Sequence, residues 1–300
     1  MKKQTENNTS EAKQTACPNS SAKQSVNTDY ETVLEHKYQI LTAELQKIRS
    51  VVIGFSGGVD STFLVTVAGK ILGDKAVAVI VASPFCPQRE MTEAKAFATQ
   101  AGVNFHIIQE NPLAEEKIAA NPPDRCYYCK KLIFGNVLKF ASEQAIKYVA
   151  DGSNADDEKD YRPGLKALKE LKIISPLQLA GLTKADIRAL SRKMGLPTWQ
   201  KESAACLASR IPYGEIITGE KLVRVDKAEN YLRQFAFSHL RVRSHGDLAR
   251  LEVGQQDMAF FANPVHRIKV AEELKKLGFN YVALDLEGYR TGSLNEVLPK

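Results

Sequence analysis

The stretch Val51-Val52-Ile53-Gly54-Phe55-Ser56-Gly57-Gly58-Val59-Asp60-Ser61 carries the strongest structural signal in the chain. It begins with consecutive β-branched residues, the pattern of a strand that is buried on both faces of a parallel sheet. Gly57 and Gly58 then allow a sharp turn and a close approach of the backbone to a ligand. A helix is predicted over residues 61–72, with Ser61 at its start, and amide groups at a helix start attract phosphate. The stretch therefore predicts a phosphate-binding connection between a strand and a helix.

The six residues 56–61, Ser-Gly-Gly-Val-Asp-Ser, narrow the kind of phosphate site. They do not form a Walker loop, because no Gly-Lys-Ser/Thr sequence follows the turn. They resemble the pyrophosphate loop of the ATP pyrophosphatase superfamily. The resemblance implies that the loop holds the β,γ-pyrophosphate of ATP while AMP is transferred to a substrate oxygen. The alternative interpretation is an ordinary strand-turn-helix connection.

Length and composition limit the class of protein. At 300 residues the chain is long enough for one large domain or two ordinary ones. It contains no apolar run that could cross a bilayer and no apolar core of a secretion signal, so we expect a cytoplasmic protein with no membrane partner. The net charge of +6 suits an anionic nucleotide ligand and does not require a nucleic acid. Five cysteines favour ligands or catalytic thiols over a disulfide framework.

The chain divides into a polar tail and two folded parts. Residues 1–29 have almost nothing to bury and are predicted to be a disordered tail. Residues 30–205 alternate between strands and helices, which predicts an α/β domain with a parallel sheet and flanking helices. The helices are predicted at 30–48, 61–72, 87–100, 124–146 and 183–194, and the strands at 51–55, 76–82, 103–108, 147–150 and 173–177.

Residues 206–300 show a different pattern and are predicted to form a smaller α+β domain. A hairpin is expected there because alternating strands flank a His-Gly-Asp turn. We assign this part to substrate binding and oligomerisation, and we expect a homo-oligomer. Its helices are predicted at 218–235 and 264–277, and its strands at 240–243, 248–253 and 281–286.

Several polar residues are predicted to lie beside the loop, because ligands of parallel sheets bind at the carboxyl ends of the strands. Asp60 is predicted to be catalytic through a bound Mg²⁺. Acidic and amide groups that follow the fourth strand suit Mg²⁺ or a ribose, with a polar turn as the alternative. The predicted ATP-binding residues are Ser56, Gly57, Gly58, Asp60, Ser61, Ala82, Ser83, Asp151, Ser153 and Asn154.

Three cysteines stand in short motifs after the first three strands. Cys126 and Cys129 share one side of a predicted helix start, and Cys206 lies in a loop of small residues. A Cys-x-x-Cys pair alone is compatible with a metal, a redox pair or chance. Thiolates suit an iron–sulfur cluster. Structural zinc would need a fourth ligand, for which Cys86 is the candidate.

Arg241-Val242-Arg243 alternates along a predicted strand. The alternation puts both guanidinium groups on one face, an arrangement suited to a nucleotide phosphate or a carboxylate. Solvated surface charges are the alternative interpretation.

The motifs together resemble the LarE family, the ATP-dependent sulfur transferases that build the nickel-pincer nucleotide of lactate racemase. The resemblance rests on residues 56–61, 151–154, 161–164, 205–210 and 241–243 in this order, and it spans about residues 30–298. It implies that ATP adenylates a carboxylate of pyridinium-3,5-biscarboxylic acid mononucleotide and that sulfur then displaces AMP to give a thiocarboxylate. The substrate-binding residues that it implies are Arg210, Glu229, Arg241 and Arg243.

Members of that family differ in their sulfur source. In one type a single cysteine, matched here by Cys206, gives up its sulfur and becomes dehydroalanine. In the other type three cysteines, matched by Cys126, Cys129 and Cys206, bind a 4Fe–4S cluster with one iron free to carry sulfide. The Cys-x-x-Cys pair favours the cluster type, with catalytic Cys206 and with sulfide or a cysteine desulfurase as the donor. The implied cofactors are ATP, Mg²⁺ and the cluster.

Two other functions are compatible with the loop and the cysteine pattern. A tRNA thiolase shares the loop and the cysteine pattern, but the chain shows no RNA-binding appendage and no dense basic stripe with aromatic residues. A non-catalytic, zinc-stabilised nucleotide sensor would use the loop and the cysteines without a reaction. Release of pyrophosphate with a substrate separates an enzyme from such a sensor.

Overall fold

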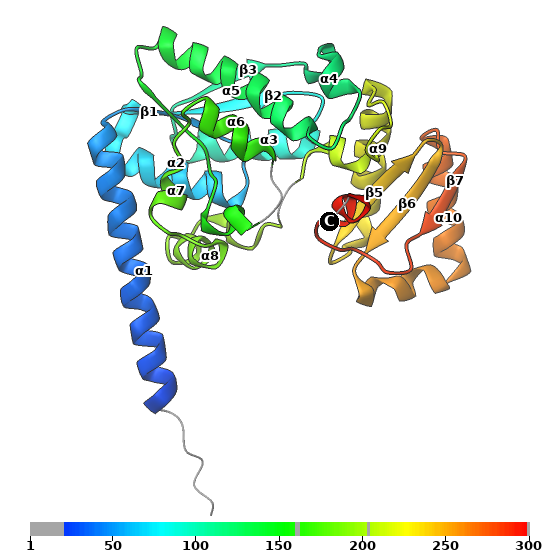
Figure 1. The fold of residues 1–300 in the computed structure, drawn as a ribbon. Helices are drawn as coiled ribbons and strands as arrows, with labels where there is room; N and C mark the ends of the chain where they lie inside the picture. The colour runs from blue at the N-terminus through cyan, green and yellow to red at the C-terminus, as the bar shows by residue number, and fades with distance from the viewer. Residues whose placement is uncertain (1–20, 160–162, 203–204, 299–300) are drawn as a thin grey trace, which may run out of the picture.

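The computed structural model describes residues 21–159, 163–202 and 205–298. A four-stranded sheet with helices around it forms the larger part, and a three-stranded sheet lies near the C-terminus (Figure 1). The strand orders are β3-β2-β1-β4 and β5-β6-β7. The predicted combination of a parallel α/β sheet and a smaller C-terminal α+β region is confirmed. The exact boundary between them near residue 205 stays a prediction.

The first sheet is entirely parallel. Its strands are β1 (Val51–Gly54), β2 (Ala76–Ala82), β3 (Phe105–Gln109) and β4 (Tyr148–Ala150). In the centre, Ile53 of β1 aligns with Ala78 on one side and Ala150 on the other. The direction of strand addition reverses between β1 and β4, and ligands of open parallel sheets bind outside the strand ends at such a point. The loop after β1 therefore stands where this topology provides a ligand site.

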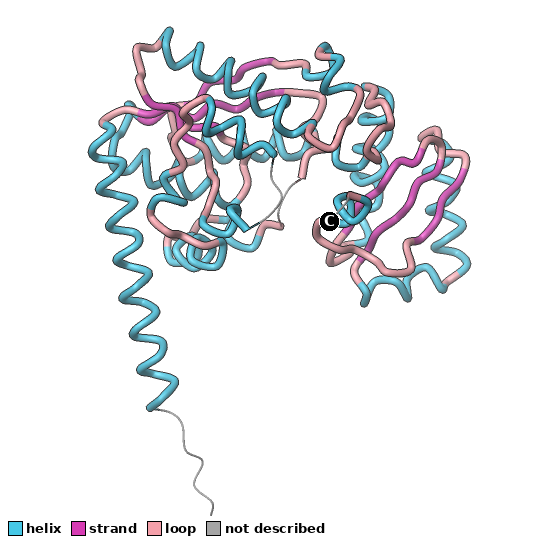
Figure 2. Tube along the Cα trace, viewed as in Figure 1, coloured by secondary structure: helices cyan, strands magenta, loops and turns pink. Residues whose placement is uncertain are grey.

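Helices cover both faces of this sheet, because successive residues of a buried strand point to opposite sides. Val51 and Ile53 face the core that is shared with α1, α2, α3, α7 and α8, whereas Val52 faces the core that is shared with α5 and α6 (Figure 2). The helices of this part are α1 (Ser21–Ile48), α2 (Val59–Leu72), α3 (Gln88–Gln100), α4 (Glu116–Ala119), α5 (Arg125–Glu143), α6 (Pro163–Glu170), α7 (Pro176–Leu179) and α8 (Lys184–Lys193).

Helix α1 begins at Ser21 and not near residue 30. Residues 21–29, which the sequence assigns to a disordered tail, are thus helical, while residues 1–20 lie outside the described part of the chain. No proline or glycine interrupts residues 21–48. A helix that is held by the buried Leu41 and Leu45 can therefore continue through polar sequence. Figure 1 shows its first turns projecting away from the sheet.

Two further predictions are corrected by the structure. Residues 173–177 do not form a strand: Ile174 makes one isolated bridge to Ala150, and α7 begins at Pro176. Proline lacks the N–H that a continued ladder needs and suits the first turn of a helix. Helix α2 begins at Val59 with Gly58 as its N-cap, so Ser61 lies inside the first turn.

The C-terminal part forms the predicted hairpin and helices. Strands β5 (Leu240–His245) and β6 (Leu248–Val253) pair antiparallel, and β7 (Tyr281–Leu284) pairs parallel with β6. Parallel neighbours need a crossover, which α10 (Pro264–Lys276) provides. Helix α9 (Gly219–Leu232) packs against β5. The predicted strand 281–286 ends two residues early, at Leu284.

The C-terminal core reaches into the first part of the chain. Phe85, which follows β2, and Ile118 of α4 belong to the same apolar cluster as Val242 of β5. Leu207 and Ile211 join this cluster from the connecting segment. The two parts are therefore held together by shared packing beside the carboxyl edge of the first sheet. Among the described helices, none is long and apolar enough to cross a membrane.

Candidate active site

The loop after β1 is shaped by one glycine and its neighbour on α3. Gly57 has a φ of +70°, which favours glycine, and a Cβ on it would approach the Cβ of Ala94 to 2.9 Å. The loop then turns into α2, whose first amide groups have no partner within the helix. These amide groups and the positive end of the helix dipole form an anion site.

Two serine hydroxyls cross the mouth of this loop. The Oγ atoms of Ser56 and Ser61 lie 3.1 Å apart, and Ser61 Oγ also accepts the Ser56 N–H at 3.3 Å. Gly152, after β4, packs so closely that a Cβ on it would meet the Ser61 nitrogen at 3.1 Å. The ends of β1 and β4 therefore meet at the loop, as the topology requires.

The predicted acidic and amide residues lie on this same edge. Asp60 accepts a hydrogen bond from the Asn154 amide at 3.4 Å and forms an ion pair with Lys184. Asp151 is buried and accepts from the hydroxyls of Ser153, at 2.5 Å, and Ser175, at 2.7 Å. The structure thus brings the loop together with the residues after β4.

Ala82 and Ser83 end β2 at the edge of the sheet next to the loop. The Ala82 carbonyl accepts the N–H of Glu110, and Ser83 Oγ accepts the N–H of Phe85 at 3.0 Å. Both residues therefore shape a turn beside the loop of residues 56–61. Their contact with ATP stays a prediction.

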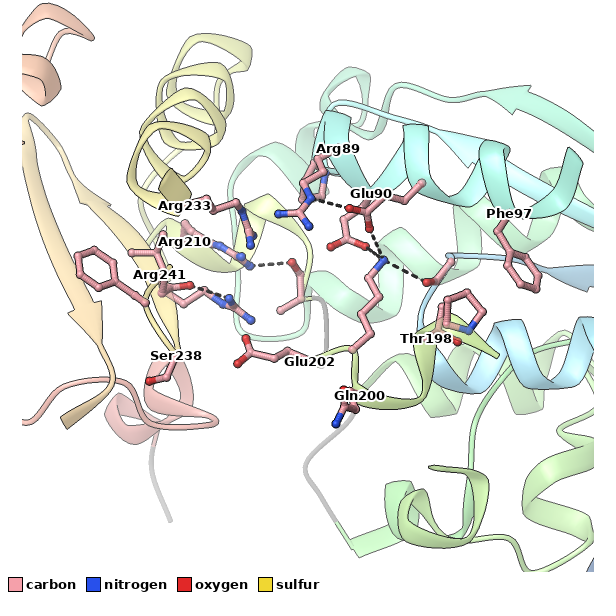
Figure 3. A pocket seen from close by; sticks show the side chains of 18 residues that line it. Arg89, Glu90, Phe97, Thr198, Gln200, Glu202, Arg210, Arg233, Ser238 and Arg241 are labelled. Carbon is pink, nitrogen blue, oxygen red and sulfur yellow. Dashed lines mark hydrogen bonds and ion pairs between the residues drawn. The ribbon is translucent and has the colours of Figure 1, made fainter. Parts of the chain in front are cut away.

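A cavity of about 660 Å³ opens beside the loop, between the first sheet and the C-terminal part. Gly57 and α3 form one wall, and the end of α9 and the start of β5 form the other (Figure 3). Between these walls the lining residues are Pro197, Thr198, Gln200, Lys201, Glu202 and Ala205. Its charged lining residues are Arg89, Glu90, Glu93, Lys201, Glu202, Arg210, Arg233 and Arg241.

The charges of this cavity are divided between its two walls. On the α3 wall, Lys201 pairs with Glu90 and Glu93, and Glu93 also pairs with Arg89, so two cations balance two anions. Lys201 Nζ donates to the carbonyl of Gly57 at 3.1 Å as well. The C-terminal wall instead presents several arginines, shown together in Figure 3. An anionic ligand group is thus better accommodated on that wall.

Arg210 and Glu229 form a buried, bidentate ion pair with N–O distances of 2.9 and 3.1 Å. Glu229 also accepts the N–H of Val242 at 3.1 Å. Burial raises the pKa of the Glu229 carboxyl, but the Arg210 guanidinium overrides this and holds that pKa below its usual range. Arg210 donates in addition to the carbonyl of Cys206 at 3.0 Å. This pair therefore fixes the cysteine segment against α9 and β5.

The two arginines of β5 differ in their surroundings. Arg241 lines the cavity and lies 5.3 Å from the ring centre of Tyr289; burial, together with the nearby Arg210, lowers the pKa of its guanidinium. Arg243 does not line the cavity. It makes two 2.9 Å bonds to Glu252 and donates to the carbonyl of Ser209 at 2.6 Å. Of the two, only Arg241 faces the space where a ligand fits.

The segments that carry the cysteines are bonded to one another. Leu207 donates its N–H to the carbonyl of Phe85 at 2.8 Å, and Arg125 donates to the carbonyl of Ala208 at 3.1 Å. A third bond joins the Asn121 amide to the carbonyl of Pro212 at 2.6 Å. The cysteines beside these contacts are Cys86, Cys126 and Cys206.

The thiols influence one another electrostatically. Burial raises the pKa of Cys129 to about 12 and that of Cys86 to about 11, with Cys206 as a further cause for both. Burial and then Cys206 also raise the pKa of Cys126. Cys206 itself is exposed. In the part of the chain that the structure describes, however, no three Cys, His, Asp or Glu side chains are arranged to hold a metal ion.

Sequence reasoning missed Lys184 and Lys201. Lys184 follows the helix-capping Thr183, and its distance of 124 residues from Asp60 hides their pairing. Lys201 lies 144 residues from Gly57 in a segment without periodic cues. The residues 161–164 of the predicted motif set lie partly outside the described residues.

Comparisons with known proteins agree with this geometry. The family of NAD synthase matches residues 33–135, which contain the loop. The pyridinium-3,5-bisthiocarboxylic acid mononucleotide synthase of Lactiplantibacillus plantarum is 38% identical over 89% of this chain and 96% of its own length. An uncharacterised Synechocystis protein is 41% identical over 89% of this chain and all of its own. A glutamine-hydrolysing GMP synthase chain of Methanococcus vannielii is 30% identical over 61% of this chain and 63% of its own.

The parallel sheet, the loop at its switch point and these relatives define a PP-loop ATP pyrophosphatase. Within that superfamily, the chain belongs to the LarE family of ATP-dependent sulfur transferases, because the similarity to the Lactiplantibacillus synthase covers nearly the whole of both chains.

Proposed function

We propose that this protein converts carboxylates of pyridinium-3,5-biscarboxylic acid mononucleotide to thiocarboxylates in nickel-pincer nucleotide synthesis. The observation that carries the proposal is one cavity with the pyrophosphate loop on one wall and Arg210 and Arg241 on the other. The name of the Lactiplantibacillus relative supports the choice of product. The reaction has two parts, activation by ATP and displacement by sulfur.

In the first part, a substrate carboxylate oxygen attacks the α-phosphorus of ATP and pyrophosphate leaves. The loop amides and the hydroxyls of Ser56 and Ser61 bind the departing pyrophosphate. Asp60 would hold a Mg²⁺, which would neutralise negative charge on the phosphates, and Lys184, which pairs with Asp60, supplies a further cation. The acyl adenylate that forms has AMP as a good leaving group.

The phosphate of the mononucleotide binds on the C-terminal wall of the cavity. Arg241 lines this wall, and Arg233 stands at the end of α9 beside it (Figure 3). Arg210 and Glu229 hold the wall in place through their buried ion pair. Arg243 supports the wall from behind through Glu252 and does not itself touch the substrate.

In the second part, a sulfide nucleophile attacks the acyl carbon and AMP leaves. Cys126, Cys129 and Cys206 would hold a 4Fe–4S cluster, which when bound supplies an iron site for exchangeable sulfide. The donor set fits such a cluster in type: three soft thiols, two of them on one helical turn, each affected electrostatically by the third. The thiols would have to draw together on binding.

The exposure of Cys206 also fits a second sulfur source, the sacrifice of its own sulfur. The deciding experiment supplies ATP, the biscarboxylic mononucleotide and sulfide to the full chain under anaerobic conditions. We expect AMP and pyrophosphate in equal amounts and a thiocarboxylate product by mass spectrometry. Release of ADP, or of AMP without any thiocarboxylate, would contradict the proposed function.

A further inference from the structure

Arg125 is a buried cation without a carboxylate partner in the described residues. It opens α5 next to Cys126, and it is among the largest fully buried side chains of the protein. Its guanidinium donates to the side-chain oxygen of Asn121, to the carbonyl of Ala208 at 3.1 Å and toward the sulfur of Cys126 at 3.9 Å. All three acceptors are uncharged when the thiol is protonated.

Two other buried arginines of the same region have carboxylate partners. Arg210 has the two oxygens of Glu229, and Arg243 has the two oxygens of Glu252. A buried charge without an opposite charge is strongly unfavourable, whereas a paired one is tolerated. The contrast indicates that Arg125 is completed by an anion that the neutral side chains around it do not supply.

The surroundings of Arg125 identify the class of that anion. Its guanidinium faces the sulfur of Cys126, and its contact with Ala208 lies two residues after Cys206. Tyr213 covers the guanidinium, with 5.9 Å between the guanidinium carbon and the ring centre. Asn121 is itself held by the carbonyls of Ile211 and Pro212, so the guanidinium cannot turn toward solvent. Of its three acceptors, the amide oxygen and the carbonyl stay neutral and only the sulfur can become anionic, so the geometry favours sulfur held between α5 and the Cys206 segment.

The geometry points to Arg125 as the positioning residue and counter-cation of an anionic sulfur site formed by Cys126 and Cys206. It binds a thiolate or a sulfide as the anionic ligand, and it fixes the distance between the two cysteine segments through Ala208. This inference rests on the proposed sulfur transfer, but it holds for a cluster and for a sacrificial cysteine alike, because both carry anionic sulfur.

The first test needs neither metal nor activity and uses the charge of one introduced side chain. Cys126→Asp places a carboxylate beside Arg125, and Cys126→Asn is its neutral isostere. We expect the Asp variant of the metal-free full chain to melt about 2–4 °C above the Asn variant. In an Arg125→Gln background the order should reverse, since the carboxylate then lacks its cation.

Equal melting temperatures of the two variants in the Arg125 background would overturn the inference. If Arg125→Gln fails to fold, the comparison within the Arg125 background still decides. This experiment is also independent of the proposed function, because it gives the same answer if the protein proves to transfer no sulfur.

The second test measures retention of iron by chain that is loaded anaerobically with iron and sulfide. Arg125→Lys keeps the charge but cannot make the forked contacts to Asn121 and Ala208, so we expect a chelator to remove its iron about tenfold faster. Arg224→Lys is the matched control. Arg224 also donates to a backbone carbonyl, that of Gly278 at 2.8 Å, and covers a ring, that of Phe279, away from the cysteines.

The control should release iron at the rate of the unchanged protein. Unchanged release from Arg125→Lys as well would overturn the positioning role. Failure of the unchanged protein to bind iron would instead contradict the proposed cluster, and the Asp and Asn comparison would then remain the test of Arg125.

Discussion

The nucleotide edge and the sulfur side of this protein lie next to each other but are built differently. At the nucleotide edge, the loop of residues 56–61 and the residues 151–154 follow adjacent strands, and their side chains already contact one another. On the sulfur side, three separate segments that carry cysteines meet through hydrogen bonds, and burial raises the pKa of the Cys126 and Cys129 thiols. In the first region the functional side chains contact one another directly, whereas in the second the contacts are made by the segments beside the thiols.

The difference teaches how each half of the reaction depends on the fold. In the proposed reaction, backbone amides and hydroxyls bind pyrophosphate, and these groups need no change of charge when the ligand arrives. The proposed sulfur delivery needs anionic sulfur, which in a buried place is favoured by a metal or by a cation such as Arg125. Damage to the sulfur side should therefore leave ATP cleavage intact, while damage to the nucleotide edge should stop both.

The largest expected effect separates the two regions by changing a cysteine. Cys206→Ala should form no thiocarboxylate but should still release AMP and pyrophosphate with the mononucleotide, because the loop is untouched. Cys17→Ala, in residues that the structure does not describe, is the matched control and should keep full activity. Product and AMP are measured in the same reaction by mass spectrometry. Loss of AMP release in Cys206→Ala would show that the regions are not separable.

The same reaction distinguishes the two sulfur sources. With a cluster, the polypeptide keeps its mass and yields more than one thiocarboxylate per chain, and Cys126→Ala and Cys129→Ala are inactive in sulfur transfer. With a sacrificial cysteine, the chain loses about 34 Da, the mass of H₂S, as a Cys side chain becomes dehydroalanine. Full activity in Cys126→Ala and Cys129→Ala, together with that loss, would contradict the cluster.

The next largest effect is expected at the nucleotide edge. Asp60→Ala removes the predicted Mg²⁺-linked carboxylate and leaves Lys184 without its partner. We expect AMP release to fall at least about a hundredfold, the usual loss when one charge-stabilising group is removed. Asp74→Ala, on the exposed turn after α2, is the control with an equal change of charge. An unchanged rate in Asp60→Ala would remove Asp60 from the site.

The sequence predicted the nucleotide edge far better than the cavity. The loop, β1 and α2 are adjacent in the chain, so glycines, hydroxyls and a β-branched run were sufficient. The pairing of Lys184 with Asp60 and the placement of Lys201 depend on contacts across more than a hundred residues. The apolar residues around Ile174 predicted a strand, but α7 begins at Pro176, which cannot continue a strand ladder.

The pair Arg241 and Arg243 shows how far a spacing argument can go. The alternation correctly predicted a strand that carries both residues. It could not show that Glu252 on the neighbouring strand β6 forms an ion pair with Arg243. Only the folded neighbours separate a ligand-facing arginine from a supporting one.

A pair of variants makes this separation measurable. Arg241→Ala should raise the KM for the mononucleotide about tenfold, since a charged contact to phosphate contributes about 1.5–3 kcal/mol. Arg243→Ala should leave the buried carboxylate of Glu252 with Arg250 as its remaining partner, and should lower the free energy of unfolding by about 1.5–3 kcal/mol, the contribution of hydrogen bonds to a charged group. KM and denaturant unfolding are compared in both variants. A tenfold increase of the KM for the mononucleotide in folded Arg243→Ala would mean that Arg243 also binds the substrate.

The smallest expected effect tests how the nucleotide edge is supported from α8. Asp186 forms a capping box with Thr183 and an ion pair with Lys37 at 2.6 Å, which together hold the helix start that presents Lys184. Burial raises the pKa of the Asp186 carboxyl, but its bonds to Lys37 and Thr183 outweigh burial and lower that pKa below its ordinary 3.8. The charged carboxylate therefore stabilises the fold above pH 3.8, and this contribution is lost as the pH falls through the lower folded value.

Asp186→Asn keeps a capping oxygen but removes the charge, so we expect a loss of only about 0.5–1 kcal/mol at pH 7. Urea unfolding of both proteins should give a difference that is constant from pH 7 to about pH 5 and shrinks below pH 4. A difference that stays the same at low pH would mean that the ion pair contributes nothing and that the cap alone positions Lys184.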